Sequence, residues 1–184
     1  MNRIHQIDPS QTAGKTKALL DGVQARLGMV PNMMRVLANA PTALQGYLSL
    51  NASLASGVLP AAVREQIALT VSEINGCEYC RTAHSLFAAK AGLSEEDVAL
   101  ARSATAVDKK AQAVLTLARA IALQRGQISD AELHAARSGG LNDAEIVETI
   151  AHVALMTFTN YTNNAARTVL DFPAAPSRVA ELAA

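Results

Sequence analysis

The sequence predicts an all-α protein that forms a single-domain bundle of several helices, and its composition supports this in three ways. Of the 184 residues, 37 are Ala, the residue with the highest helix propensity. Only six residues are aromatic and none is Trp, so residues that favour strands are scarce. A chain of this length typically forms about one domain. We therefore expect one all-helical domain over residues 1–184, with a core of small, closely packed side chains.

Gly and Pro mark the boundaries of the first five predicted helices. Gly28 stops the first helix, Pro41 suits the first turn of the third, and Asn75-Gly76 interrupts the chain directly before Cys77. The predicted helices run over about Thr12–Leu27, Met33–Ala38, Pro41–Ser56, Pro60–Ile74 and Cys77–Ala91.

Polar capping residues mark three of the later helices. Each has an acidic residue three positions further on, the spacing of a capping box: Ser94 with Asp97, Ser129 with Glu132, and Asn142 with Glu145. Apolar residues at helical spacing predict one more helix over about Val107–Arg125, which Gly126 closes. The tail after Pro173 is expected to be loose.

Two parts of the chain resemble each other at an offset of 48 residues, which indicates a diverged internal duplication. The first repeat spans about 60–105 and the second about 107–170. The offset aligns Ala83, Ala88, Gly92 and Leu93 with Ala131, Ala136, Gly140 and Leu141. Chance similarity between two Ala-rich segments is the alternative. The residues that could carry thiol chemistry occur only in the first repeat, because the second has Ala113, Arg125, Ile128 and Glu132 in place of Glu65, Cys77, Cys80 and His84.

Charge and hydropathy argue against several functions. The 16 Lys and Arg residues balance the 16 Asp and Glu residues, so nothing electrostatic indicates binding to nucleic acid or to an anionic membrane. No apolar run has the length of a membrane span or of a signal peptide, which predicts a cytoplasmic protein. Only 17% of the residues are charged, which predicts a homo-oligomer whose subunits pack through Ala-rich helix faces. The helix over Pro60–Ile74, apolar on more than one side, is the main candidate for such a face.

Cys77, Cys80 and His84 form the motif Cys-x2-Cys-x3-His. If Cys77 opens a helix, the three side chains project from one side of it and the imidazole can reach a thiol. A helix N-terminus and a nearby imidazolium both favour the thiolate, which is the nucleophilic form of cysteine. Two thiols at this separation can close a disulfide and open it again, with no metal or organic cofactor. The spacing alone does not choose the attacking thiol.

The cysteine pair has two alternative interpretations, a zinc site and an inert buried pair. Zinc needs a fourth ligand, and the remaining histidines, His5, His134 and His152, form no second paired motif.

Glu65 lies twelve residues before Cys77, opposite the main apolar face of its predicted helix. Its neighbours there are small and largely apolar, which predicts a raised pKa and proton exchange near neutral pH. The alternative is a solvated carboxylate on the helix surface. Glu73 lies closer to the cysteines in sequence, but we rank it below Glu65 because it immediately precedes the helix break.

Tyr79 and a later group of aromatic and amide residues can each be interpreted in two ways. Tyr79, between the thiols, is either a pocket wall or an ordinary packing residue. A later cluster either closes a substrate pocket or packs helices through amide hydrogen bonds; it consists of Phe158, Asn160, Tyr161 and Asn164.

The pattern Glu-x11-Cys-x2-Cys-x3-His resembles the alkyl hydroperoxidase D family, within the wider carboxymuconolactone decarboxylase-like group. The segments Val30-Pro31-Asn32 and Asp171-Phe172-Pro173 also resemble its branch of peroxidase-related proteins. The resemblance implies an all-helical, duplicated fold and assembly into trimers or hexamers. It further implies the roles of four residues: Cys80 is the peroxidatic thiol, Cys77 the resolving thiol, and Glu65 and His84 the proton relay.

One residue departs from the family pattern, since Tyr79 stands where the founding peroxidases have a histidine. The expected function is a thiol-dependent peroxidase that reduces hydrogen peroxide or an organic hydroperoxide, with a thiol or dithiol electron donor that the sequence does not identify. A redox-sensing or structural oligomer with little turnover is one alternative. Another is a cofactor-free decarboxylase or isomerase that uses Glu65 and His84.

Overall fold

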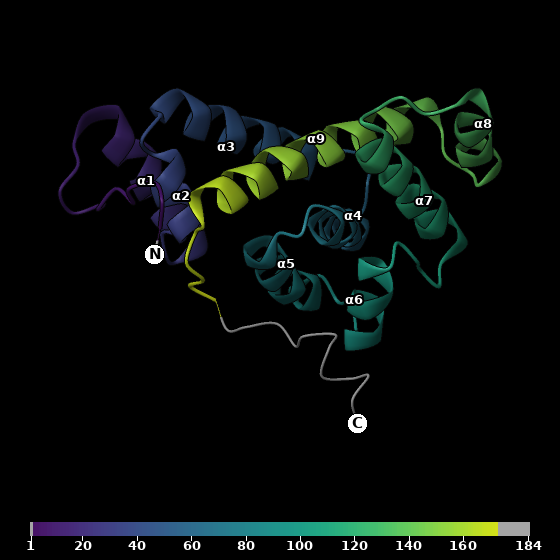
Figure 1. The fold of residues 1–184 in the computed structure, drawn as a ribbon, viewed down its shortest axis with the longest axis horizontal. Coiled ribbons are helices and arrows are strands. Elements are labelled where there is room, and N and C mark those ends of the chain that lie inside the picture. Colours follow the sequence, from purple (N-terminus) through teal and green to yellow (C-terminus); the bar gives the residue numbers. More distant parts are fainter. Residues whose placement is uncertain (1, 173–184) are drawn as a thin grey trace.

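A computed structural model of the chain describes residues 2–172, which form nine α-helices and, within that range, no strand (Figure 1). The all-α prediction is confirmed. The expected loose tail after Pro173 lies outside the described residues. The helices are α1 (Gly14–Leu27), α2 (Asn32–Leu37), α3 (Pro41–Ala55), α4 (Ala61–Ile74), α5 (Glu78–Lys90), α6 (Glu95–Arg102), α7 (Lys109–Gln124), α8 (Asp130–Ser138) and α9 (Asp143–Ala166).

The helix boundaries follow the local signals in the sequence. Every predicted boundary agrees with the observed one to within two residues. The three predicted capping boxes form in full. The side chains of Ser94, Ser129 and Asn142 each accept a hydrogen bond from the backbone N–H three residues further on. The acidic side chain at that position accepts one from the backbone N–H of the capping residue. Local hydrogen bonding therefore sets where these helices begin.

Helix α4 occupies the centre of the molecule, with α5, α6, α7 and α9 packed around it (Figure 1). Seven consecutive residues, Gln66 to Ser72, are buried. Since a helix turns once in 3.6 residues, this run covers the whole circumference of α4. The apolar faces of α4 are thus covered by other helices of the same chain. The prediction that this helix supplies a face for subunit contacts was wrong.

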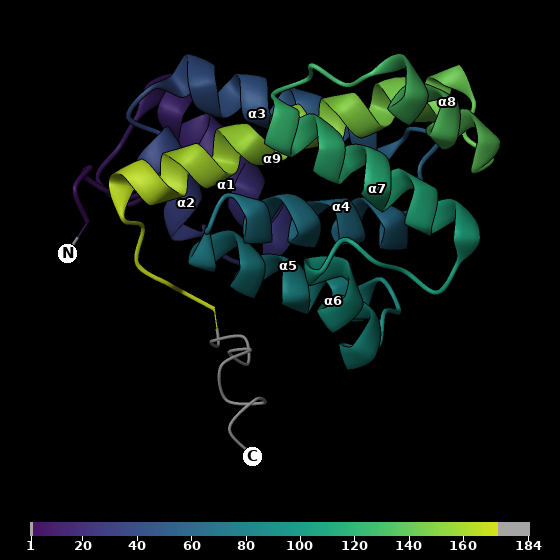
Figure 2. The same ribbon diagram turned by 45° about the vertical axis from the view of Figure 1, so that its right-hand side comes forward.

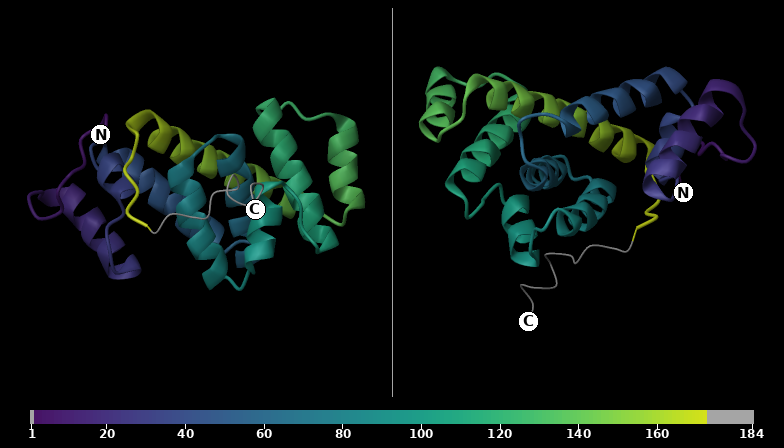
Figure 3. Two further views of the ribbon diagram at one scale, coloured as in Figure 1. Left: turned by 60° about the horizontal axis from the view of Figure 1, so that its bottom comes forward. Right: turned by 180° about the vertical axis from the view of Figure 1, so that it is seen from behind.

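The second half of the helical order repeats the first. Helices α4 and α7 begin at residues 61 and 109, α5 and α8 end at 90 and 138, and α6 and α9 begin at 95 and 143. These pairs agree with the predicted offset of 48 residues. Helix α8 packs on α7 at the edge of the molecule (Figure 3), whereas its counterpart α5 packs on the central α4. The duplication itself stays a prediction.

Helices α1, α2 and α3 form a group at one end of the molecule, where α2 and α3 contact α9 and α1 contacts α3 (Figure 2). This group faces α4 and α5 across a cavity that the three helices help to line. Among residues 2–172, no helix combines the length and the apolar character that crossing a membrane requires.

Candidate active site

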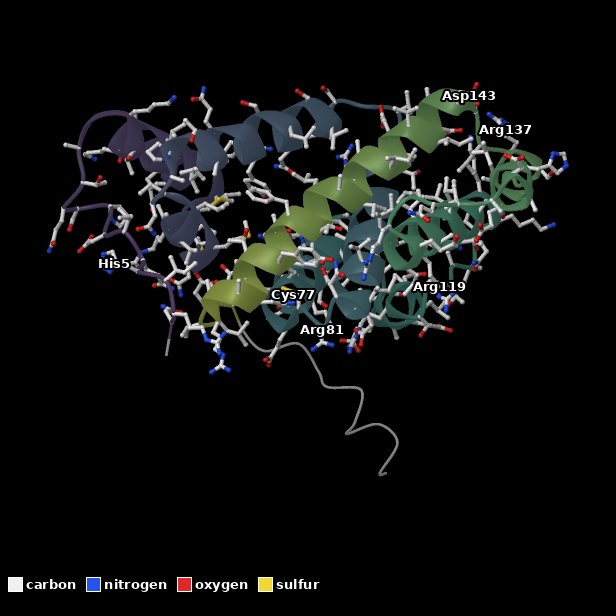
Figure 4. All side chains as sticks on the ribbon, turned by 45° about the horizontal axis from the view of Figure 1, so that its top comes forward. His5, Cys77, Arg81, Arg119, Arg137 and Asp143 are labelled. Carbon is white, nitrogen blue, oxygen red and sulfur yellow. The ribbon has the colours of Figure 1, made fainter. Side chains whose placement is uncertain are left out.

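The turn between α4 and α5 positions both cysteines. Gly76 adopts φ +61°, in the left-handed region that suits glycine, and the N–H of Cys77 donates to the carbonyl of Ser72 at 2.9 Å. Cys77 then becomes the N-cap of α5, and its sulfur accepts from the N–H of Cys80 at 3.4 Å. The prediction that Cys77 opens the helix is confirmed. Figure 4 shows Cys77 beside the C-terminal half of α9, far from Asp143 at the other end of that helix.

The two cysteines are both free thiols and both buried, but they differ in access. Cys80 lines a cavity of about 540 Å³, together with Glu65 and His84, and Cys77 is not among its lining residues. Of the two cysteines, Cys80 is therefore the one that borders the cavity.

The environment separates the acidities of the two thiols. A hydrogen bond with the Cys77 side chain lowers the pKa of Cys80 to about 6, against the opposing effect of burial. The charge of His84 and the amides of Asn163 and Asn160 lower it further. The same hydrogen bond, together with burial, raises the pKa of Cys77. The surroundings therefore favour the thiolate on Cys80 and the protonated thiol on Cys77.

Glu65 and His84 form the second part of the site. The Nδ1 of His84 lies 2.7 Å from Oε2 of Glu65, which joins α4 to α5 across 19 residues of sequence. Burial alone would lower the pKa of His84, but the negative charges of Glu65 and Cys80 outweigh it, and the pKa is raised. Only 23% of the Glu65 side chain is exposed, so the alternative of a solvated surface carboxylate is wrong.

Glu73 has a different role. Its carboxylate pairs with Arg81 at 3.2 Å and with Arg102 at 2.9 Å, which connects α4 to α5 and α6. Figure 4 labels Arg81, whose side chain is partly exposed, and the buried Cys77. None of the three residues of this ion-pair network lines the cavity. Ranking Glu73 below Glu65 agrees with this placement.

The sequence analysis missed Asn163, which touches the reactive sulfur. Its Nδ2 donates to Sγ of Cys80 at 3.2 Å, and its Oδ1 is buried with no partner among the described residues. Among the described residues, the amide of Asn163 therefore bonds to the Cys80 sulfur alone. A signal was present, since polar residues recur at helical spacing on the buried face of α9, where such side chains are unusual: Thr149, His152, Asn160 and Asn163.

The later cluster packs helices and does not close the cavity. Asn160 bonds to Asn75 and Ser72, and Asn164 donates to the carbonyl of Asn75 at 2.8 Å. The other two members, Phe158 and Tyr161, are exposed. None of the four lines the cavity, and the interpretation as amide hydrogen bonding between helices holds for Asn160 and Asn164 only.

Tyr79 is both a wall of the cavity and a packing residue. Its hydroxyl accepts from the N–H of Met33 at 3.3 Å, and its ring meets Phe172 edge-on with centroids 5.7 Å apart. Burial and the nearby Asp171 raise the pKa of its hydroxyl, so it stays protonated and cannot replace a histidine as a proton acceptor.

Within residues 2–172, no three His, Cys, Asp or Glu side chains gather in a way that could hold a metal ion.

Comparisons with known proteins show what this sequence and this fold are similar to. Residues 41–120 match the model of the carboxymuconolactone decarboxylase family. This segment contains α4 and α5 with Glu65, Cys77, Cys80 and His84. No curated protein matches the chain in sequence.

Several solved structures share the fold. A peroxidase-related protein from Ralstonia eutropha JMP134, with an alkylhydroperoxidase AhpD core, is 19% identical and superposes with a TM-score of 0.82 over 92% of each chain. A peroxidase-related protein from Silicibacter sp. TM1040 is 23% identical, with a TM-score of 0.76 over 92% of this chain and 94% of that chain. A cysteine-to-alanine variant of the debrominase Bmp8, in complex with 2,3,4-tribromopyrrole, is 18% identical, with a TM-score of 0.78 over 93% of this chain and 92% of that chain.

Residues 41–120 thus match the carboxymuconolactone decarboxylase family, and the fold of the chain is that of solved alkyl hydroperoxidase D-like proteins. Both findings agree with the resemblance of the cysteine motif. Proteins of this fold carry different names, since one is a debrominase and two are described as peroxidase-related.

Proposed function

We propose that the protein is a thiol-dependent peroxidase that reduces hydrogen peroxide or an organic hydroperoxide through a disulfide cycle of Cys77 and Cys80. The observation that carries the proposal is the arrangement at one wall of the cavity. A cysteine with a lowered pKa borders the cavity, and a protonated cysteine is hydrogen-bonded to it. That arrangement supports attack by Cys80 and resolution by Cys77.

The cycle has three balanced steps. The Cys80 thiolate attacks the terminal oxygen of the hydroperoxide, the O–O bond breaks, and the departing alkoxide takes a proton to become an alcohol, or water in the case of hydrogen peroxide. The Cys77 thiol then attacks the Cys80 sulfenic acid, which forms the disulfide and releases water. A thiol or dithiol donor finally reduces the disulfide to two thiols and is itself oxidised to a disulfide.

Glu65 and His84 serve the proton transfers. His84 acts on Cys80 through its charge and is held by Glu65 at 2.7 Å, so a protonated imidazole stabilises the thiolate and can supply the proton that the alkoxide needs. Glu65 orients the ring and keeps its pKa high enough for this task.

The partners of this cycle follow from its chemistry. The donor must reach a disulfide that borders the cavity, and a cytoplasmic location suits the cycle because thiol donors are maintained there. We also propose that the active form is a homo-oligomer, as the family resemblance implies.

Mixing the reduced protein with peroxides in a stopped-flow instrument tests the proposal. Hydrogen peroxide, tert-butyl hydroperoxide and cumene hydroperoxide should each convert two thiols into one disulfide, with a mass loss of about two hydrogens. Added dithiothreitol should then sustain turnover. Replacing Cys77 with Ser should stop the cycle at a sulfenic acid on Cys80, which dimedone traps. Two thiols that persist after treatment with every peroxide would refute the proposal.

The same experiment separates the alternatives. A redox sensor would form the disulfide but consume no further peroxide when dithiothreitol is added. A cofactor-free decarboxylase or isomerase would keep its activity when both cysteines are replaced. Because a debrominase shares the fold, 2,3,4-tribromopyrrole belongs in the panel, and release of bromide without peroxide consumption would favour that reaction.

A further inference from the structure

The cavity is much larger than hydrogen peroxide needs. It has a volume of about 540 Å³, whereas a water molecule occupies about 30 Å³ in the liquid. Most of the side chains that line it are apolar. They come from α1, α2 and α3, from α5, and from the segment after α9; among them are Val23, Leu27, Met34, Leu48, Phe87 and Phe172. A cavity of this size and lining suits a ligand with a sizeable carbon skeleton.

One cation lines this apolar cavity without a protein partner. Besides the Cys80 thiol, the lining residues with ionisable groups include Arg26, Glu65 and His84, and the last two pair with each other. Arg26, in the last turn of α1, is exposed, and its side chain forms no ion pair or hydrogen bond with any described residue. Its guanidinium is therefore available to an anion that enters the cavity.

Tyr47 connects this cation to the reactive end of the cavity. Burial raises the pKa of Tyr47 to about 12, negative charges on Cys80 and Glu65 add to the rise, and the positive charge of Arg26 opposes it. A single hydroxyl thus lies within electrostatic reach of both the thiol and the guanidinium. Its O–H forms no hydrogen bond with a described residue and can donate to a ligand between them.

We propose that the substrate is an organic hydroperoxide that carries a carboxylate on an apolar carbon chain. This inference rests on the proposed peroxidase function and names its substrate class. The carboxylate binds Arg26, the apolar walls cover the chain, and the hydroperoxide group meets Cys80. Attack by Cys80 converts the hydroperoxide to an alcohol and leaves the carboxylate unchanged, so Arg26 selects the substrate and takes no part in the redox step.

The test compares a fatty acid hydroperoxide with its uncharged ester. Linoleic acid hydroperoxide and its methyl ester have the same carbon chain and peroxide group, and both are used below the concentration at which the acid forms micelles. The wild-type protein should prefer the acid by about tenfold or more in kcat/KM, the usual scale for a hydrogen bond to a charged group. In Arg26→Gln the ratio should fall to about one, through a higher KM for the acid. Arg26→Lys should retain part of the preference.

Lys15→Gln is the matched control, because it removes an equal charge from the exposed face of the same helix, outside the cavity lining. It should keep the preference for the acid.

Three outcomes would overturn the inference. Equal rates for acid and ester in the wild type, or an acid preference that survives in Arg26→Gln, would refute the substrate class while the peroxidase function stands. If Lys15→Gln lost the preference as well, general attraction by positive charge would explain it. Consumption of no hydroperoxide at all would refute the proposed function and this inference together.

Discussion

At the scale of single residues, the Cys80 sulfur is the atom on which the site converges. Its neighbours are a protonated thiol, an imidazole held by a carboxylate, and an amide donor. Each of these favours a negative charge on sulfur, which burial opposes. Their separate contributions can be measured by substitution.

Loss of either member of the relay should slow the reaction. Glu65→Gln and His84→Ala should each reduce the rate of Cys80 oxidation by peroxide about 10²-fold or more, the usual scale for general acid–base catalysis. Glu73→Gln should have a much smaller effect on this rate, because its carboxylate pairs with Arg81 and Arg102 outside the cavity. Stopped-flow kinetics with a fixed peroxide measures all three. A Glu65→Gln rate within about twofold of wild type would refute the role of that carboxylate.

Asn163 should tune the acidity of Cys80. Asn163→Ala removes a hydrogen bond to the thiolate at 3.2 Å, and a bond of this kind corresponds to a pKa rise of about one unit. Alkylation of Cys80 by iodoacetamide across a pH series gives its pKa directly. Asn164→Ala is the matched control, since Asn164 donates to the carbonyl of Asn75 on the surface. A pKa that moves equally in both variants would show that Asn163 acts only through folding.

The pH profile should report the lowered pKa of Cys80. Since this pKa lies at about 6, the thiolate is lost as the pH falls through that value. The rates of alkylation and of oxidation by peroxide should therefore drop about tenfold per pH unit below about 6 and level off above it. Cys77→Ala should shift the midpoint upward, because the thiol that donates to Cys80 is gone. A wild-type midpoint at about 8.5, the ordinary cysteine value, would contradict this prediction.

At the scale of elements, the turn between α4 and α5 determines where the cysteines lie. Gly76 has φ +61°, a conformation that costs a residue with a Cβ about 1–2 kcal/mol. Gly76→Ala should lower the free energy of unfolding by about that amount. Gly46→Ala, inside α3 with open space around it, should instead raise it by about 0.8–1 kcal/mol through helix propensity.

Urea unfolding followed by circular dichroism measures both glycine variants. The two substitutions should change the free energy of unfolding in opposite directions, because the backbone at Gly76 is left-handed and the backbone at Gly46 is helical. A Gly76→Ala protein as stable as the wild type would mean that the turn tolerates another conformation.

At the scale of the whole molecule, the exposed face of α9 is the candidate for subunit contacts. Four large apolar side chains recur there at helical spacing; they are Val147 (62% exposed), Ile150 (44%), Phe158 (40%) and Tyr161 (61%). Such a stripe is unusual on a monomer surface. It replaces α4 as the face through which we predict that copies of the chain associate.

Light scattering at micromolar concentration tests this assembly. The wild type should have the mass of an oligomer, a trimer or a hexamer by the family resemblance, and Tyr161→Asp should shift it toward the monomer. Val107→Asp is the control, because Val107 is 79% exposed but lies in a loop outside the stripe. A wild-type monomer would refute the prediction, and equal dissociation by both variants would mean that α9 is not the interface.

The sequence alone determined the features that depend on neighbours within a few residues. Capping boxes, glycines and prolines set the helix boundaries to within two residues. The spacing of Cys77, Cys80 and His84 placed these side chains on one side of α5, because positions three and four apart share a helix face. Fold class and motif were therefore predictable.

Only the tertiary structure decided which distant residues meet. Packing of α4 on α5 brings Glu65 to His84, 19 residues away, and packing of α9 brings Asn163 to Cys80, 83 residues away. It also buries every face of the middle of α4 and forms the cavity that Arg26 helps to line. Helical periodicity says which face of a helix is apolar, but the partner of that face depends on the simultaneous packing of all the helices.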